Sequence, residues 1–111
     1  MRIDFYHTND GKVPAREYID SLDGKQAQKV TQTLESIRDY EGRVPSTMLK
    51  KLKGTNIWEV RVIFAGNIFR LLSFFDAGNL IIVAHGFTKK TQKTPKREID
   101  TAERRRRNYF A

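Results

Sequence analysis

Two arginines stand in the middle of adjacent apolar runs of this chain. Arg61 lies in the segment IWEVRVIF at residues 57–64, and Arg70 lies in NIFRLLSFF at residues 67–75. An arginine inside a strand is costly unless its guanidinium group reaches water, an acid or a bound anion. Two such cations side by side would bind a phosphate group and stabilise negative charge that develops on it.

The short connection between the two runs predicts a β-hairpin that places both arginines on one face. If the turn is 65–66, Arg61 lies directly opposite Arg70. If the turn is 66–67, Arg61 faces Leu72 instead, but the alternation of side chains still keeps both arginines on the same side.

The two faces of this hairpin differ in polarity. One is almost uniformly apolar and should pack against helices; it carries Trp58, Val60, Val62, Phe64, Phe69, Leu71, Ser73 and Phe75. The face with the arginines mixes apolar and charged residues, which suits a binding surface better than a buried layer.

Other basic residues could complete a site on the arginine side. In the run 48–53, a strand with Leu52 inward would place Lys51 and Lys53 on the opposite face. With a two-residue turn at 77–78, Arg70 would pair with His85, and the arginine side would also carry Ile81, Val83, Phe87 and, if the strand extends that far, Lys89. A loop of three or five residues would reverse that parity.

Composition indicates one basic globular domain. The chain has 111 residues, 39% hydrophobic content and a net charge of +8, which favours nucleic acid, an acidic protein or an anionic membrane surface as partner. The lack of cysteine excludes disulfides and fits a reducing cytoplasm. With two distant histidines, a structural metal site is not expected. No membrane-spanning run or signal peptide is expected either.

The hydrophobic pattern predicts a β-α-α-β-β-β-β-α order in a single domain covering residues 1–111. The expected strands are 1–7, 48–53, 57–64, 67–75 and 80–88, and the expected helices are 13–22, 25–40 and 96–109. Thr94 and Pro95 should provide the N-cap and first position of the last helix. The fold class is α+β: a small, mostly antiparallel sheet with the two N-terminal helices on one face and a C-terminal helix.

Three segments, KLKGTNIWEVRV, NIFRLLSFF and VAHGFTKKTQKTPKREIDTAERR, resemble the RelE/HigB toxins of type II toxin–antitoxin systems, most of all their phage-derived Gp49-like branch. The resemblance extends over nearly the whole chain and is densest at residues 49–104. It implies a RelE-like fold and a ribosome-dependent mRNA endoribonuclease that inhibits translation. The implied reaction needs no metal or cofactor: the ribose 2′-hydroxyl attacks the adjacent phosphate and leaves a 2′,3′-cyclic phosphate.

The resemblance also implies roles for individual residues. Arg61 matches the arginine of the family's strand motif and Arg70 a second family arginine, both expected to stabilise the phosphate. Lys89 and Lys90 occupy the family's Lys-Lys position at the end of the last strand. His85 is a further catalytic candidate. The candidates for RNA binding are Lys51, Lys53, Lys93, Arg104 and Arg105.

The general base and acid stay open at this point. Several relatives carry a tyrosine near the end of the last strand, where this chain has Thr88, Lys89 and Lys90. A lysine of lowered pKa or a histidine could serve as base. Each of these side chains also has an ordinary structural role open to it, as a solvated lysine or a buried histidine.

The resemblance implies mRNA, the ribosome and a cognate helix-turn-helix antitoxin as partners, and no membrane. Two other functions remain open. One is a ParE-like inhibitor of DNA gyrase without nuclease activity, although members of that branch generally lack clustered sheet cations. The other is a basic RNA-binding protein without catalysis.

Overall fold

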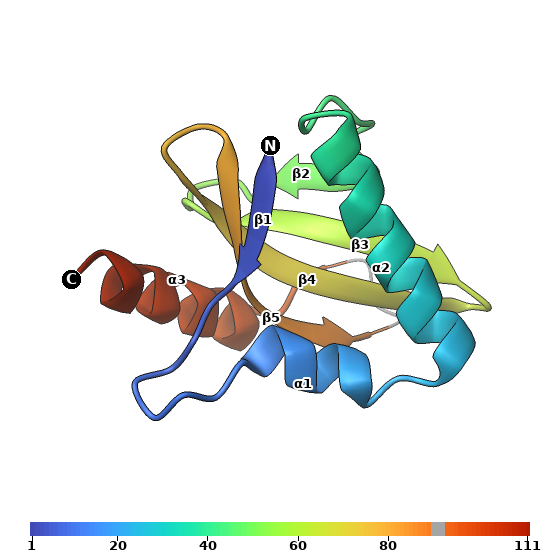
Figure 1. The fold of residues 1–111 in the computed structure, drawn as a ribbon, viewed down its shortest axis with the longest axis horizontal. Coiled ribbons are helices and arrows are strands. Elements are labelled where there is room, and N and C mark those ends of the chain that lie inside the picture. The colour runs from blue at the N-terminus through green and yellow to red at the C-terminus, as the bar shows by residue number, and fades with distance from the viewer. Residues whose placement is uncertain (90–92) are drawn as a thin grey trace.

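A five-stranded mixed sheet crosses the middle of the protein, with helices on both of its faces (Figure 1). The computed structural model describes residues 1–89 and 93–111. Its elements are β1 (Arg2–Phe5), α1 (Pro14–Asp20), α2 (Gly24–Asp39), β2 (Leu49–Lys51), β3 (Trp58–Phe64), β4 (Asn67–Asp76), β5 (Leu80–Thr88) and α3 (Lys96–Phe110). The strand order is β1-β5-β4-β3-β2, with β1 parallel to β5 and the other pairs antiparallel. The predicted element order and α+β class are confirmed.

The helices α1 and α2 pack on one side of the sheet, called here the helix face. The apolar positions of α2 recur at Val30, Leu34 and Ile37, and they meet the apolar hairpin face predicted from the sequence. Asp23 begins α2 with a capping box that its side chain forms with Gln26. This layer is the larger core of the protein.

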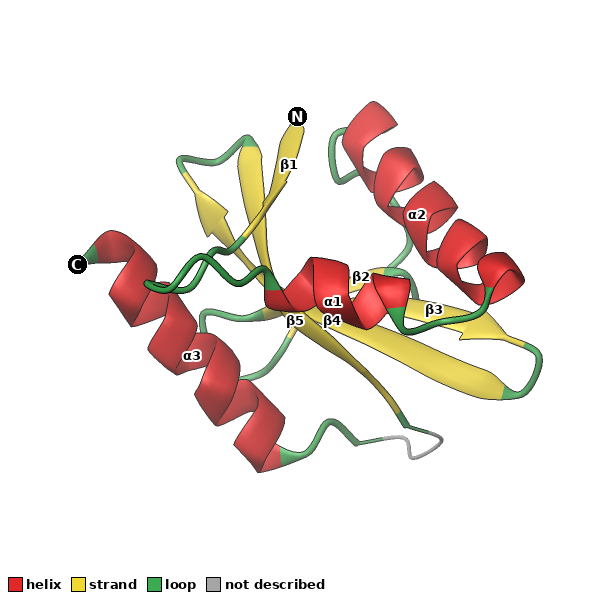
Figure 2. Ribbon diagram, turned by 60° about the horizontal axis from the view of Figure 1, so that its bottom comes forward, coloured by secondary structure: helices red, strands yellow, loops and turns green. Residues whose placement is uncertain are grey.

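The opposite side of the sheet, called here the arginine face, carries Glu59, Arg61, Arg70 and Leu72. The helix α3 crosses part of it, as Figure 2 shows. Ala102 of α3 packs there in a second apolar cluster with Leu72 and Phe74. The arginine face is therefore a buried layer under α3 and open only beyond it, rather than a binding surface throughout.

The β3–β4 hairpin has the first of the two registers considered. Phe64 pairs with Asn67 and Arg61 lies opposite Arg70. Both turn residues, Ala65 and Gly66, have positive φ, 52° and 79°, which suits the twist of a tight hairpin. The shared face of the two arginines is confirmed.

The pairing of β4 with β5 differs from the one expected. Asp76 pairs with Leu80, so three residues connect the strands, and this reverses the parity. Ile81 and Val83 consequently belong to the core of the helix face. A bulge opposite the step from Leu72 to Ser73 then adds one residue to β5 and reverses the parity again.

After the bulge, β5 regains the predicted face but not the predicted partner. His85 lies opposite Leu72, and Phe87 lies opposite Arg70. The expected pairing of Arg70 with His85 is therefore wrong by two residues, although His85 and Phe87 do lie on the arginine face.

Close packing between α1 and β5 depends on Gly86. The Tyr18 ring lies directly over this glycine, and a Cβ there would overlap the ring. The Tyr18 hydroxyl also lies 2.7 Å from Thr88 Oγ1 in a hydrogen bond.

The substitution Gly86→Ala should lower the free energy of unfolding by about 1–3 kcal/mol, because the added methyl group displaces Tyr18. Gly24→Ala is the matched control, since it lies at the start of α2 with no atom within 4 Å of its Cβ position. Urea denaturation of the three proteins measures both effects. Equal stability of Gly86→Ala and the unaltered protein would contradict the packing described.

Candidate functional site

A cleft of about 300 Å³ opens on the arginine face beside the start of α3. Four cationic side chains and one carboxylate line it within the described part of the chain. Its lining residues are Ser46, Lys50, Leu52, Lys53, Glu59, Arg61, Lys93, Thr94 and Ile99. This set is called the cationic cleft below.

Three separate segments bring these cations together. Arg61 projects from β3 and is partly exposed. Lys50 pairs with Glu59 across the β2–β3 ladder, so it shares the arginine face, and Lys53 lies in the turn after β2. Lys93 comes from the segment that leads into α3. The cleft therefore joins the edge of the sheet to the start of the last helix.

Arg70 lies beneath the cationic cleft, not in its lining. Its exposed fraction is 0%. Its Nη1 donates a hydrogen bond to Thr94 Oγ1 at 3.0 Å and lies 3.5 Å from Glu59 Oε1. The guanidinium predicted to meet a phosphate is instead engaged by a buried acid and a buried hydroxyl.

Thr94 was expected to cap α3, but it does not. Pro95 takes the N-cap position and no side chain caps the helix. The Thr94 hydroxyl instead donates to Glu59 Oε1 at 2.7 Å. The oxygen of this hydroxyl, which a cap would use as the acceptor of a backbone N–H, accepts from Arg70 Nη1.

The lysines of β2 are arranged differently from the prediction. Lys51 pairs with Trp58 and so lies on the helix face, away from the cationic cleft. Lys50, which the sequence analysis did not select, lines the cleft, as does the predicted Lys53. The strand spans three residues with Leu49 inward, and only the β2–β3 register distinguishes Lys50 from Lys51.

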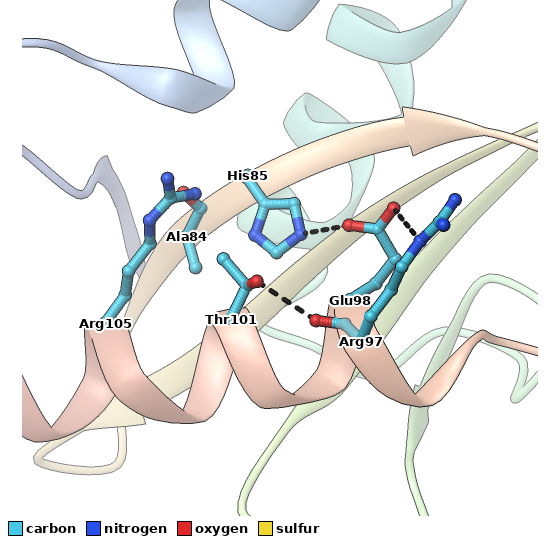
Figure 3. Close-up of polar contacts among 6 residues, drawn as sticks. All are labelled: Ala84, His85, Arg97, Glu98, Thr101 and Arg105. Atoms are coloured by element: carbon cyan, nitrogen blue, oxygen red, sulfur yellow. Dashed lines mark hydrogen bonds and ion pairs between the residues drawn. The ribbon is translucent and has the colours of Figure 1, made fainter.

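His85 lies between β5 and α3, outside the residues that line the cationic cleft (Figure 3). Its side chain is nearly buried, and its Nε2 lies 3.1 Å from Glu98 Oε1. Arg105 lies nearby, and its Nη1 donates a hydrogen bond to the Ala84 carbonyl oxygen at 3.3 Å. Burial lowers the pKa of His85 and the charge of Arg105 lowers it further, while Glu98 acts in the opposite direction.

The remaining candidates are dispersed. Lys89 continues β5, where its backbone N–H donates to the Ile68 carbonyl at 3.0 Å. Lys90 lies outside the described residues. Arg104 and Arg105 line a separate pocket of about 260 Å³ together with Tyr6, Thr8, Asn9 and Asn108. Of the ten site residues predicted, the structure brings Arg61, Lys53 and Lys93 into one cleft.

Two kinds of feature are missing from the described ranges 1–89 and 93–111. No group of three or more His, Cys, Asp or Glu residues there could hold a metal ion. No helix there has the length and apolar character needed to cross a membrane.

The cationic cleft can bind an anion and stabilise charge on it. An arginine binds two phosphate oxygens with fixed geometry, and lysines add charge with more freedom of position. Fold and cleft together define a small basic α+β domain with a cleft lined mainly by cationic side chains among its charged residues.

The sequence places this domain in a known family. Residues 17–107 match the model of the family described as "Phage derived protein Gp49-like (DUF891)". The chain belongs to this family, which is related to the RelE/HigB toxins. No curated protein matches the chain significantly.

A nuclear magnetic resonance titration of the two histidines tests the description of His85. The midpoint for His85 should lie below the ordinary value of 6.5, because burial and Arg105 disfavour its charged form. The unfolded chain then binds a proton more readily than the folded one, so the stability that neutral His85 contributes above pH 6.5 is lost as the pH falls. A His7→Gln variant assigns the two signals. A midpoint for His85 above 6.5 would contradict the description.

Proposed function

We propose that this protein is the toxin of a type II toxin–antitoxin system and acts as a ribosome-dependent mRNA endoribonuclease. The observation that carries the proposal is the partly exposed Arg61 in a cleft with three lysines. Membership of the Gp49-like family supports a toxin. A cleft of about 300 Å³ lies at the lower end of the range of ligand pockets, and it suits a phosphate with its sugar.

The proposed reaction is a metal-independent transesterification. The 2′-oxygen of a ribose forms a bond to the adjacent phosphorus while the bond to the 5′-oxygen of the next nucleotide breaks. The products are a 2′,3′-cyclic phosphate and a 5′-hydroxyl. One group accepts the proton of the 2′-hydroxyl and another supplies a proton to the leaving oxygen.

Arg61 is proposed to bind the nonbridging oxygens of the phosphate, where charge increases in the transition state. We propose that an ammonium group of Lys50, Lys53 or Lys93, which line the same cleft, protonates the leaving oxygen or adds charge stabilisation. Lys89, which directly follows β5, and Lys90 remain candidates for the same role. His85 is instead assigned to the docking of α3, because it pairs with Glu98 away from the cleft.

Contacts with ribosomal RNA are assigned to the separate pocket of Arg104 and Arg105. Its lining is cationic or neutral throughout. Lys51 on the opposite face is the remaining predicted RNA contact, and it is assigned no role in the reaction. The proposed partners are mRNA, the ribosome and a cognate antitoxin.

The substitution Arg61→Ala should lower mRNA cleavage by about 100-fold or more, because it removes one preorganised charge contact to the phosphate. Lys29→Ala is the matched control: it also removes one cation, from the exposed side of α2 and away from the cleft. Primer extension on mRNA in a translation extract measures the cuts. Full cleavage by Arg61→Ala, or inhibition of DNA gyrase by the unaltered protein with mRNA left intact, would contradict the proposal.

A separate binding experiment tests the pocket of Arg104 and Arg105. Arg104→Ala should weaken ribosome binding and reduce the slope of log affinity against log salt by about 1, as expected for one lost phosphate contact. Lys25→Ala, an exposed cation in the first turn of α2, removes the same charge elsewhere. Equal slopes for the two variants would assign no phosphate contact to Arg104.

A further inference from the structure

Three buried polar side chains form a hydrogen-bond network, called the Thr94 network below, between the sheet and the segment before α3. Arg70 is 0% exposed, Glu59 5% and Thr94 7%. The Thr94 hydroxyl accepts from Arg70 at 3.0 Å and donates to Glu59 at 2.7 Å. It thus lies between the members of an ion pair whose atoms are 3.5 Å apart.

An ion pair of this kind is weak evidence for a role in stability. Removing two charges from water costs several kcal/mol per ion, and a well-packed apolar pair of similar volume is often as stable. The geometry of this ion pair has a consequence other than stability. It holds a hydroxyl from a third segment in one place, because a hydrogen bond to each charged partner fixes the Thr94 side chain.

The position of Thr94 connects the Thr94 network to the cationic cleft. Thr94 and Glu59 both line the cleft, and the next residue before Thr94 is the cleft cation Lys93. Glu59 is two residues from Arg61 on β3, and Arg70 is the cross-strand partner of Arg61. The Thr94 network therefore attaches the segment that carries Lys93 to the strand that carries Arg61.

The helix α3 has other attachments to the rest of the protein. Glu98 contacts His85, and Glu103 accepts a hydrogen bond from the backbone N–H of Asn56 at 2.9 Å. Ala102 is fully buried against the sheet. Loss of the Thr94 hydroxyl should therefore release the segment before the helix while leaving the helix docked.

We propose that Thr94 is a positioning residue that sets the distance between Lys93 and Arg61 across the cationic cleft. Arg70 and Glu59 act through Thr94 and do not touch the RNA. The inference rests on the proposed function for its effect on cleavage. Its structural part, the attachment of the segment 93–95 to the sheet, is independent of any activity.

The test compares three variants of the full chain. Thr94→Val keeps the shape and removes the hydroxyl, and Thr94→Ser keeps the hydroxyl. Thr101→Val is the matched control on the same helix, because the Thr101 hydroxyl bonds only to the Arg97 carbonyl of its own helix among the described contacts. Each variant is examined for cleavage of mRNA on the ribosome and for amide hydrogen exchange at residues 93–99.

Thr94→Val should lower kcat by about tenfold to 100-fold, since a displacement of about 1 Å in a catalytic group can cost that much. Its KM should stay within about threefold, because Arg61, Lys50 and Lys53 still bind the RNA. Thr94→Ser and Thr101→Val should remain close to the unaltered protein. Exchange near Thr94 should become faster in Thr94→Val alone.

Several outcomes would overturn the inference. One is full activity of Thr94→Val where Arg61→Ala is inactive; another is a rise in KM with unchanged kcat; a third is an equal loss in Thr94→Ser. If the unaltered protein cleaves no mRNA, the proposed function fails and hydrogen exchange alone decides the structural part. Unchanged exchange in Thr94→Val would then overturn that part as well.

Discussion

The register of one hairpin places two guanidinium groups directly opposite each other, and the arginine face is organised around that constraint. Like charges across a ladder destabilise a sheet, yet Arg61 and Arg70 are cross-strand partners. The two arginines differ in burial. Arg70 is buried against Glu59 and Thr94, whereas Arg61 is partly exposed and lines a cleft. One arginine thereby becomes part of the interior, and the other can meet an anion.

The two layers of the protein follow from this division. On the helix face, α1 and α2 cover an apolar surface and build the larger core. On the arginine face, α3 covers the apolar part through Ala102 and leaves the cationic cleft beside its first turn. The site lies where the covering helix begins, so its shape depends on how the segment before α3 is attached. A buried acid, Glu59, and a buried threonine, Thr94, lie next to the cleft, and the hydrogen bond between them is part of that attachment.

Much of the fold could be predicted because its signals are local. Alternation and a tight turn were enough to place Arg61 and Arg70 on one face and to identify the apolar face of the hairpin, but they left two registers open, of which the structure has the one that pairs the two arginines. The β4–β5 pairing was not predictable in this way, because a three-residue connection and a bulge each shift the parity by one. The choice between Lys50 and Lys51 depended on a ladder between two strands with no tight turn between them. The burial of Arg70 depended on Thr94, 24 residues later in the chain, and no local pattern contains that contact.

The most direct test of the central claim is a structure of the protein on a ribosome programmed with mRNA whose reactive 2′-hydroxyl is replaced by hydrogen. The account predicts a backbone phosphate within hydrogen-bond distance of the Arg61 guanidinium, with the cleft lysines around it. It also predicts that Arg70 keeps its contacts with Glu59 and Thr94. A phosphate held by Arg70, or an mRNA backbone that passes outside the cationic cleft, would contradict it.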